Sequence, residues 1–508
     1  MPLAHSHPPI ASPSAGAARP GEWRLRDWGL ADWVLAALLA LLTLHAAGVC
    51  RDFIAAIRYP FALDYGEGIV WQQAALIPGP RAYGGSGALP FVVFHYPPLY
   101  HLVVRAVARL TPDMLTAGRL VSVLSTALLV PLIAGLVLAA SPAREGQPRI
   151  PRLAIASAAG LLAPCLHAVR AWGPLMRVDM LAVALGLSAL LVAARSDGGF
   201  RGAAWALLLA VAAVYAKQTE LAPGVAVFLV SLSRRPRAAL GAAAIALLAG
   251  LGLLGVLQVV TNGGFLHNII GGNLNRFSPG SARAVFSKEV SSLPVALLIG
   301  LSAGAIFRPA GPAAWPRQLL ALHFLLSTVM LATVFKSGSD INYLIDWLCI
   351  GSVLVGVAAC ELFKTPRPFA VATGCLILAI LTLPLRRTPD TAPQAVLTEQ
   401  ADLVRLIAAA RAPVASEDMT LLMRAGKPVI FEPAIVTELS AVNRWDQAPL
   451  LAMIRAGRFA FMITIDDERG GSTLRSPGVD AAMRASYPRT ERIGALYLWL
   501  HRPPRQAA

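Results

Sequence analysis

A short stretch, FALDYGEGIVWQQ at residues 61–73, follows the first long apolar run and carries two carboxylates, Asp64 and Glu67, between apolar residues. In a helix these two side chains lie three positions apart on one face. Just outside a bilayer, a carboxylate keeps some water and can still reach a substrate that is carried by a lipid. The alternative is an ordinary capped and solvated helix beside the membrane. The rest of the chain favours the first interpretation.

Composition indicates the class of protein. Of the 508 residues, 56% are hydrophobic and 14% are charged, and the mean hydropathy is +0.61. Apolar runs of transmembrane length recur between Trp28 and Leu385, which is typical of a polytopic membrane protein. The net charge of +16 does not indicate a nucleic-acid partner, because the Arg residues lie largely in short loops and in the polar C-terminal region.

The cysteines indicate neither a disulfide framework nor a zinc site. Four of the five lie inside apolar runs and the fifth ends one, and no CxxC or Cys/His spacing is present. These residues are Cys50, Cys165, Cys349, Cys360 and Cys375.

Residues 1–28 are predicted to be a disordered cytoplasmic tail. They are rich in Pro, Ala and Ser, and Arg19, Arg24 and Arg26 directly precede the first apolar run. A cleaved signal peptide fits less well, because that run begins late, is about 20 residues long and has no small-residue cleavage site after it. We therefore expect the run to remain as the first membrane helix.

The segment 97–112 is predicted to lie on the outer surface as an amphipathic helix. Its apolar part is short and is interrupted by Arg105 and Arg109, so it does not suit a hydrocarbon core about 30 Å thick. With this segment outside, the Arg-bearing loops all fall on the cytoplasmic side, as the positive-inside rule requires. These loops are 141–152, 233–237, 307–317 and 363–368.

Eleven membrane-spanning helices are then expected, within residues 29–385. Their approximate bounds are 29–50, 117–140, 151–169, 179–195, 202–216, 220–233, 238–260, 291–307, 319–335, 342–362 and 368–385. The first external loop is 51–116. Four polar segments share the outer face with it, namely 170–179, 216–220, 261–289 and 336–343. Candidate chemistry is therefore expected on one side of the membrane.

Residues 386–508 have the polar composition of a soluble domain. The stretch VASEDMTLLMRAGKPVIFE (414–432) reads as strand, helix and strand, and RFAFMITID and ALYLWLHRP read as later strands. We expect a small external α/β domain. It contains no phosphate-binding Gly loop and no metal-ligand spacing, which favours a covering or acceptor-positioning role over catalysis of its own.

The order of these motifs resembles the GT-C membrane glycosyltransferases, in particular the branch of the lipid A aminoarabinose transferase and the related protein mannosyltransferases. The motifs are DYGEG, YPPLY, AGRLVSVL, RVDMLAVAL, YAKQTELAP, LNRF and KSGSDINY, within roughly residues 29–362. The resemblance implies a catalytic acidic residue in the first external loop, a sugar donor on a polyprenyl phosphate, and an acceptor that arrives from the outer face.

The resemblance also implies roles for single residues. Asp64 matches the first acidic residue of the family's Asp-Glu motif, whereas Glu67 departs from its adjacent spacing. Further matches are Asp179 in the second external loop, Lys217 in the third, Arg276 in the long loop and Tyr343 in the last. The aminoarabinose branch has Glu-Lys-Pro where this chain has His95, Tyr96 and Pro97, and a histidine where it has Asn273, so its metal and phosphate contacts are not reproduced literally.

Transfer of a sugar from phosphate to a hydroxyl requires a base near the acceptor and positive charge near the departing phosphate. Asp64 is the predicted base, and Glu67 and Asp179 are further catalytic candidates. The donor phosphate has six candidate contacts: Lys217, Arg276, Lys336, Arg177, Tyr343 and Tyr96.

Simpler roles stay open for several of these residues. Lys217 can snorkel to the interface, Arg177 can pair with Asp179, and Tyr96 and Tyr343 suit an aromatic belt. Arg119, at the start of a membrane helix, is expected to be an interface anchor. His101 and His167 are expected to be structural.

A divalent cation, Mg²⁺, Mn²⁺ or Zn²⁺, is a possible cofactor. His95 and Asp64 are its candidate ligands, although a lone histidine is more often simply hydrogen-bonded.

The sequence therefore predicts a glycosyltransferase of the cytoplasmic (inner) membrane with an extracytoplasmic active site. Its expected partners are a polyprenyl-phosphate sugar, membrane lipids, and a lipid, glycan or protein acceptor. One alternative is a transporter or flippase of a lipid-linked saccharide, which predicts inverted repeats and mid-span charges that the chain does not clearly show. Another is a non-catalytic partner in envelope assembly, which does not require Asp64 and Asp179.

Overall fold

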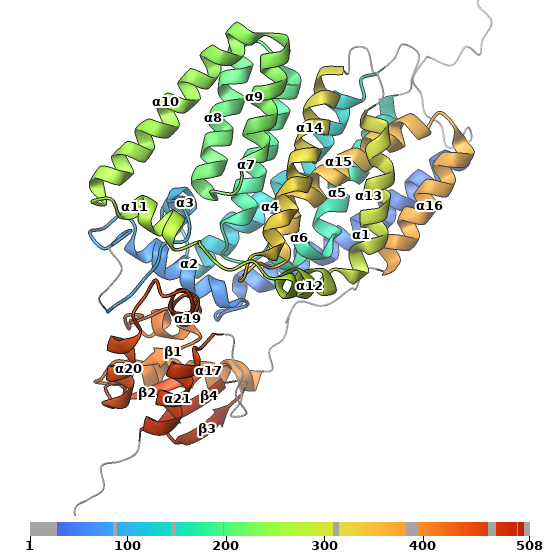
Figure 1. The fold of residues 1–508 in the computed structure, drawn as a ribbon. Helices are drawn as coiled ribbons and strands as arrows, with labels where there is room; N and C mark the ends of the chain where they lie inside the picture. The colour runs from blue at the N-terminus through green and yellow to red at the C-terminus, as the bar shows by residue number, and fades with distance from the viewer. Residues whose placement is uncertain are drawn as a thin grey trace, which may run out of the picture.

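The structure is a computed structural model. It describes residues 28–84, 89–143, 149–196, 198–307, 314–382, 394–465, 474–494 and 496–501. The predicted tail at 1–28 lies outside this range except for its last residue. Figure 1 shows a bundle of long helices and, at one end of it, a smaller unit that contains the C-terminal sheet.

All eleven apolar segments form helices. Their bounds are α1 Leu30–Arg58, α4 Met114–Ala140, α5 Arg149–Cys165, α7 Asp179–Arg195, α8 Phe200–Ala216, α9 Ala222–Arg234, α10 Pro236–Val260, α13 Leu293–Ile306, α14 Ala314–Met330, α15 Ile345–Leu362 and α16 Pro366–Thr382. Five helices of the described chain are long and apolar enough to cross a membrane, or six if the bent pair that ends in α13 is one span. The fold is thus that of a multi-pass membrane protein, and the count of eleven spans stays a prediction.

The first helix is longer than predicted. It continues past Cys50 to Arg58 because its charged residues find partners. Asp52 is buried and accepts a hydrogen bond of 2.6 Å from Arg170, and Arg51 lies 3.3 Å from the other oxygen of the same carboxylate. A buried charge that is paired in this way does not have to end the helix.

Small residues let the central helices approach closely. A Cβ added to Gly160 of α5 would lie 2.4 Å from the carbonyl oxygen of Val130 in α4. One added to Gly356 of α15 would lie 2.6 Å from the side chain of Val137 in α4. Close helix contacts through small residues are characteristic of membrane bundles, where lipid removes the hydrophobic drive for association.

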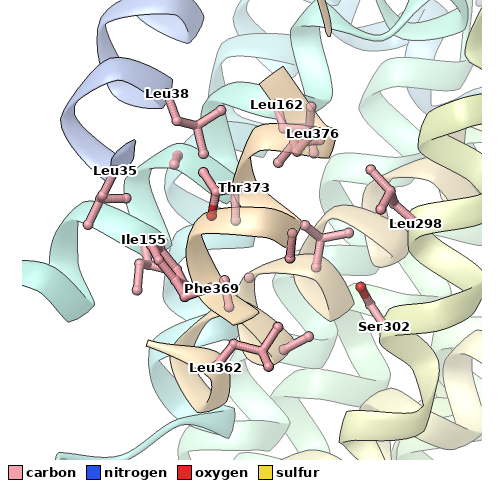
Figure 2. A pocket seen from close by; sticks show the side chains of 17 residues that line it. Leu35, Leu38, Ile155, Leu162, Leu298, Ser302, Leu362, Phe369, Thr373 and Leu376 are labelled. Atoms are coloured by element: carbon pink, nitrogen blue, oxygen red, sulfur yellow. The ribbon is translucent and has the colours of Figure 1, made fainter. Parts of the chain in front are cut away.

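An apolar cavity of about 70 Å³ lies among α1, α5, α13, α15 and α16 (Figure 2). Its lining includes Leu35 near the start of α1, Leu362 at the end of α15 and Phe369 near the start of α16. At its other end, α1 leads into the loop that carries Asp64, and the other end of α15 begins shortly after Tyr343. This cavity is therefore far along the bundle from the candidate site.

The first loop contains two helices, α2 at Tyr65–Leu76 and α3 at Leu99–Val107. Asp64 is the N-cap of α2 and accepts a hydrogen bond of 2.9 Å from the Gly66 N–H. Nine residues of α3 rise only about 14 Å, less than half of a hydrocarbon core. This length agrees with the prediction that the segment does not cross the membrane, which stays a prediction. One side of α3, with Tyr100, His101 and Val104, is buried.

The C-terminal unit has a four-stranded sheet of order β1-β2-β4-β3. Its strands are β1 Ala415–Ser416, β2 Phe461–Thr464, β3 Arg489–Ile493 and β4 Leu496–Leu500. Its helices are α17 Gln394–Ala409, α18 Met419–Arg424, α19 Pro433–Ala441, α20 Ala448–Arg455 and α21 Pro477–Ser486. Strands β1 and β2 are parallel, whereas β4 is antiparallel to both β2 and β3.

One strand prediction in this unit is wrong and one strand was missed. PVIFE (428–432) does not join the sheet, because the Ile430 carbonyl accepts a hydrogen bond of 2.7 Å from the Phe91 N–H of the first loop and Phe431 bridges to Phe91. Strand β3, RTERI, is mostly exposed and has no apolar face. Hydrophobic periodicity could predict neither the pairing of PVIFE with the first loop nor the exposed strand β3. The pattern of apolar residues shows which side chains are buried, but not which segment a strand pairs with.

The C-terminal unit packs directly on the first loop. Phe61 shares a hydrophobic cluster with Leu403 and Met419. A Cβ added to Gly68 of α2 would lie 2.8 Å from the Met419 Cβ, so α2 and α18 nearly touch. In Figure 1, α2 lies between the bundle and this unit, with α19 next to it, and α12 (Pro279–Lys288) lies at the same end of the bundle. The Ala434 N–H of α19 donates a hydrogen bond of 3.0 Å to the Tyr65 hydroxyl at the start of α2. The unit therefore covers the loop that carries Asp64.

Candidate active site

Asp64 is held at the start of α2 with part of its carboxylate open. Its side chain is 26% exposed, and its Oδ1 atom lies 3.2 Å from Nη1 of Arg177. Gly66 makes this approach possible, because a Cβ there would lie 1.1 Å from the same Nη1 atom. Burial raises the pKa of Asp64, Arg177 opposes the shift, and the negative charge of Glu67 adds to it. Asp64 is thus a better proton acceptor than an ordinary aspartate.

Arg177 connects Asp64 to a second acidic group. Its guanidinium lies 5.0 Å from the centre of the Trp172 ring, at the end of the short helix α6 (His167–Trp172). Its Nε atom is buried and has no hydrogen-bond partner among the described residues. The Trp172 indole N–H donates a hydrogen bond of 2.9 Å to Oδ2 of Asp179. Arg177 therefore contacts Asp64 rather than Asp179, which was its simpler predicted partner.

Asp179, the first residue of α7, joins three segments. Its Oδ1 atom accepts hydrogen bonds of 2.7 Å from Lys217 Nζ and 2.8 Å from Asn342 Nδ2, in addition to the Trp172 bond on Oδ2. Lys217 is the C-cap of α8, and Asn342 lies in the short helix η6 (Ile341–Leu344). With both oxygens engaged, Asp179 is arranged to orient Lys217.

The Lys217 ammonium is buried and does not snorkel to the interface. It also lies 5.0 Å from the centre of the Tyr343 ring. Tyr343 therefore lies beside the site rather than in a belt facing lipid.

Glu67 is completely buried in an ion pair with Arg119. Both side chains are 0% exposed, and Arg119 donates hydrogen bonds of 2.8 and 2.7 Å to the two Glu67 oxygens. The same oxygens accept hydrogen bonds from the N–H groups of Met176 and Leu63. Arg119 also donates to three backbone carbonyls, those of Ala56, Tyr59 and Phe61. This arrangement suits a residue that holds the loop in place, not one that touches substrate.

The prediction that Arg119 anchors at the membrane interface is therefore wrong. A wholly buried guanidinium needs a full set of acceptors, and the loop supplies them. Its position at a helix start resembles that of an anchor, and the sequence did not reveal its partner 52 residues earlier.

Lys336 and Arg276 lie on neighbouring extended segments. The Ser337 N–H donates a hydrogen bond of 2.7 Å to the Arg276 carbonyl, and Phe277 bridges to Lys336. Lys336 Nζ is 3.5 Å from Asn273 Oδ1. Burial lowers the pKa of Lys336, and the nearby charge of Lys217 lowers it further. Arg276 points the other way and donates to the carbonyl of Ala441 at the end of α19.

Tyr96 lies near Arg177 and Lys217. Burial raises its pKa to about 12, and the positive charge of Arg177 opposes this shift. Its hydroxyl therefore stays protonated at neutral pH and can donate a hydrogen bond. The preceding residue, His95, holds this part of the loop in place, because its carbonyl accepts hydrogen bonds of 2.7 Å from Gln218 and 2.9 Å from Asn273.

The two candidate metal ligands have other partners. His95 Nε2 lies 3.2 Å from Glu432 Oε2 of the C-terminal unit, whereas Asp64 pairs with Arg177. Within the described ranges, no group of three His, Cys, Asp or Glu side chains is arranged to hold a metal ion. We therefore assign no reaction step to a metal.

The two histidines that were expected to be structural, His101 and His167, contact protein side chains. His101 Nε2 lies 3.1 Å from Gln73 Oε1, and His167 Nδ1 lies 2.6 Å from Glu289 Oε1. The sequence reasoning missed Trp172, Gln218 and Asn342, although each is in a segment predicted to face the site. Neutral side chains carry no charge signal, so their proximity to Asp179 and His95 was not visible.

Comparison with known proteins identifies the fold. No protein-family model matches the chain, and no curated protein matches its sequence. The chain is similar to the crystal structure of ArnT from Cupriavidus metallidurans in the apo state, with 14% identity, 91% of this chain and 98% of that chain covered, and a TM-score of 0.58. The chain is also similar to ArnT from Cupriavidus metallidurans bound to undecaprenyl phosphate, with 13% identity, 90% of this chain and 97% of that chain covered, and a TM-score of 0.57.

A weaker likeness links the chain to an oligosaccharyltransferase from Archaeoglobus fulgidus in the apo form. It has 9% identity, covers 84% of this chain and 69% of that chain, and has a TM-score of 0.48. The likeness to ArnT extends over nearly all of both chains, and at this identity it concerns the fold. The resemblance noted in the sequence is thereby confirmed: the chain has the GT-C fold.

Proposed function

We propose that this protein is a membrane glycosyltransferase that moves a sugar from a polyprenyl phosphate to an acceptor hydroxyl. The observation that carries the proposal is the Asp64 carboxylate, partly exposed and with a raised pKa, beside the buried cation Arg177. Lys217 binds Asp179, which also accepts a hydrogen bond from Trp172, the residue whose ring lies beside Arg177. The charge of Lys217 lowers the pKa of Lys336, so these two cations lie near each other. A base next to a cationic cluster is what sugar transfer from a phosphate requires.

The reaction follows from this arrangement. Asp64 takes the proton of the acceptor hydroxyl while the oxygen of that hydroxyl bonds to the anomeric carbon of the sugar. The bond between that carbon and the phosphate oxygen breaks, and its electron pair stays on the phosphate. Arg177, Lys217 and Lys336 stabilise this charge, and the Tyr96 hydroxyl donates a hydrogen bond to it. The buried Arg177 Nε, which has no partner among the described residues, supplies one such donor.

The lipid nature of the donor rests on two arguments. In the related fold, ArnT has been crystallised with undecaprenyl phosphate. In this chain, the cations gather where the helix bundle ends, and a polyprenyl phosphate presents its anion at that depth while its tail stays in hydrocarbon. We place this site on the extracytoplasmic face of the inner membrane, where a lipid, glycan or protein acceptor would meet it.

A reconstituted assay tests the proposal. Purified protein in liposomes is given acceptor lipids or glycans with either polyprenyl-phosphate sugars or nucleotide sugars. We expect transfer only from the lipid donors. Transfer from a nucleotide sugar without polyprenyl phosphate would contradict the proposal, and movement of a lipid-linked saccharide across the bilayer without sugar transfer would favour a transporter.

A further inference from the structure

A second, polar cavity of about 40 Å³ lies behind Lys217 and Tyr343. Its walls come from the turn that precedes α9, the end of α14 and the start of α15. Besides Lys217 and Tyr343, the lining includes Glu220, Ser327, Asp346 and Trp347. The cavity thus shares Lys217, Tyr343 and Asn342 with the proposed phosphate site, whereas Glu220, Ser327, Asp346 and Trp347 have no part in the reaction described above.

Glu220 gives this cavity an unused acceptor. The residue is 7% exposed, and its Oε1 atom is buried without a hydrogen-bond partner among the described residues. A Cβ added to Gly186 of α7 would lie 3.1 Å from this atom, so α7 packs closely against it. The Glu220 N–H donates a hydrogen bond of 3.0 Å to the Lys217 carbonyl, which holds both residues in one turn. Burial and the nearby charge of Asp346 raise the pKa of Glu220 to about 8, so at neutral pH this side chain is largely protonated and carries an O–H donor as well as an acceptor oxygen. A buried carboxyl oxygen normally has a hydrogen-bond partner, and here a ligand can supply it.

Asp346 provides a second carboxylate in the same cavity. Its Oδ1 atom lies 3.2 Å from Nε2 of the buried His323, and its side chain remains 18% exposed. Trp347 and Tyr343 add aromatic surface to the lining. Two carboxyl groups with aromatic neighbours can form hydrogen bonds with hydroxyl groups, and the aromatic rings can pack against the apolar faces between those hydroxyls.

We propose that this cavity binds a hydroxyl-bearing edge of the donor's sugar and that Glu220 determines which sugar is accepted. The inference rests on the proposed function. A phosphate at Lys217 brings the attached sugar to the cavity wall that Lys217 forms. The volume corresponds to about two or three water molecules, so the cavity suits two hydroxyls or one hydroxymethyl group rather than a whole ring. A site built to hydrogen-bond a hydroxyl strongly rejects an analogue that lacks it.

Binding measurements on Glu220→Gln test this inference. The probes are undecaprenyl phosphate and its mannosyl, glucosyl and galactosyl phosphodiesters, each bound to purified full-length protein in detergent or nanodiscs. For the sugar that wild type prefers, we expect affinity to fall about tenfold or more in the variant. Binding of undecaprenyl phosphate alone should change less than twofold, and the preference among the three sugars should shrink.

Glu289→Gln is the matched control. Glu289 is also 7% exposed, but its oxygens contact His167 and Ser292. We expect this variant to keep the wild-type ratio between the glycosylated and bare lipids, even if its folding is weakened. Equal losses for both kinds of lipid in Glu220→Gln, or no loss, would overturn the inference. A different result would also overturn the inference: donor binding unchanged in Glu220→Gln, together with a rise in thermal stability on adding sodium or potassium that wild type shows and the variant lacks.

The failure of the proposed function gives a different result. If wild-type protein binds none of the four lipids, the proposed function is wrong and the inference falls with it. If wild type binds the lipids and the variant retains its sugar preference, only the inference is wrong.

Discussion

At the scale of single residues, the sequence singled out Asp64 in the first loop but did not reveal the structural role of Glu67. Asp64 could be singled out because a carboxylate between apolar runs is unusual. Glu67 has the same signal, yet both its oxygens bind Arg119 and two backbone N–H groups. A charge in an apolar stretch shows that a partner is needed, but long-range packing determines whether that partner is substrate or protein.

The pH dependence of kcat/KM tests the state of Asp64. Its pKa is raised by burial and lowered by Arg177. The base acts only when deprotonated, so activity should be lost as pH falls through a value above about 4, the ordinary pKa of aspartate. Arg177→Gln removes the opposing charge and should move this acidic limb to higher pH. A limb that stays in place in the variant would show that another group titrates.

The Glu67–Arg119 pair should matter for stability. Glu67→Gln leaves the guanidinium buried without its counter-charge, so we expect the free energy of unfolding to fall by about 3 kcal/mol or more. Unfolding in detergent, followed by circular dichroism, measures this. Glu361→Gln, in which the acid is 29% exposed and contacts Arg317 and Lys364, should lose clearly less. Similar losses would contradict the central place given to the buried pair.

At the scale of elements, periodicity and length predicted the helices well, and loops were harder. The apolar runs predicted all eleven helices of the bundle because hydrophobic content alone distinguishes them. Segment PVIFE was read as a strand of the sheet, but it pairs with Phe91 of the first loop. The contact between segments about 340 residues apart arises from tertiary packing, which no local pattern encodes.

Gly66 should be required for the position of Arg177. Alanine suits a helix better than glycine, so Gly66→Ala should not destabilise α2 by itself. Its Cβ would displace the Arg177 guanidinium, and we expect kcat/KM to fall by about 10²-fold. Gly48→Ala in α1, where a Cβ meets nothing within 4 Å, is the control and should be neutral. Full activity in Gly66→Ala would show that the Asp64–Arg177 contact is dispensable.

At the scale of the whole molecule, the predicted external segments do lie together. Contacts link Asp64 to Arg177, Asp179 to Lys217 and Asn342, and His95 to Gln218 and Asn273. Charge distribution across loops predicted this grouping because it reports topology directly. It could not predict that the C-terminal unit packs on the loop, since that interface is built from apolar residues such as Phe61 and Met419.

The orientation in the membrane can be tested by labelling. In a cysteine-free background, Ala401→Cys in α17 and Thr365→Cys between α15 and α16 are exposed positions. In intact cells, an impermeant thiol reagent should label position 401 and spare position 365 until the membrane is opened. The reverse pattern would place the candidate site on the cytoplasmic face and contradict the proposed location.

The most direct test of the account is sugar transfer by Asp64→Asn under single-turnover conditions. Asparagine also caps helices, so α2 should form, but an amide cannot take the acceptor's proton. Asp113→Asn is the matched control, because Asp113 caps α4 in the same loop and is 24% exposed. We predict that the rate falls by about 10²-fold or more in Asp64→Asn and stays near wild type in Asp113→Asn. A wild-type rate in folded Asp64→Asn would contradict the central claim.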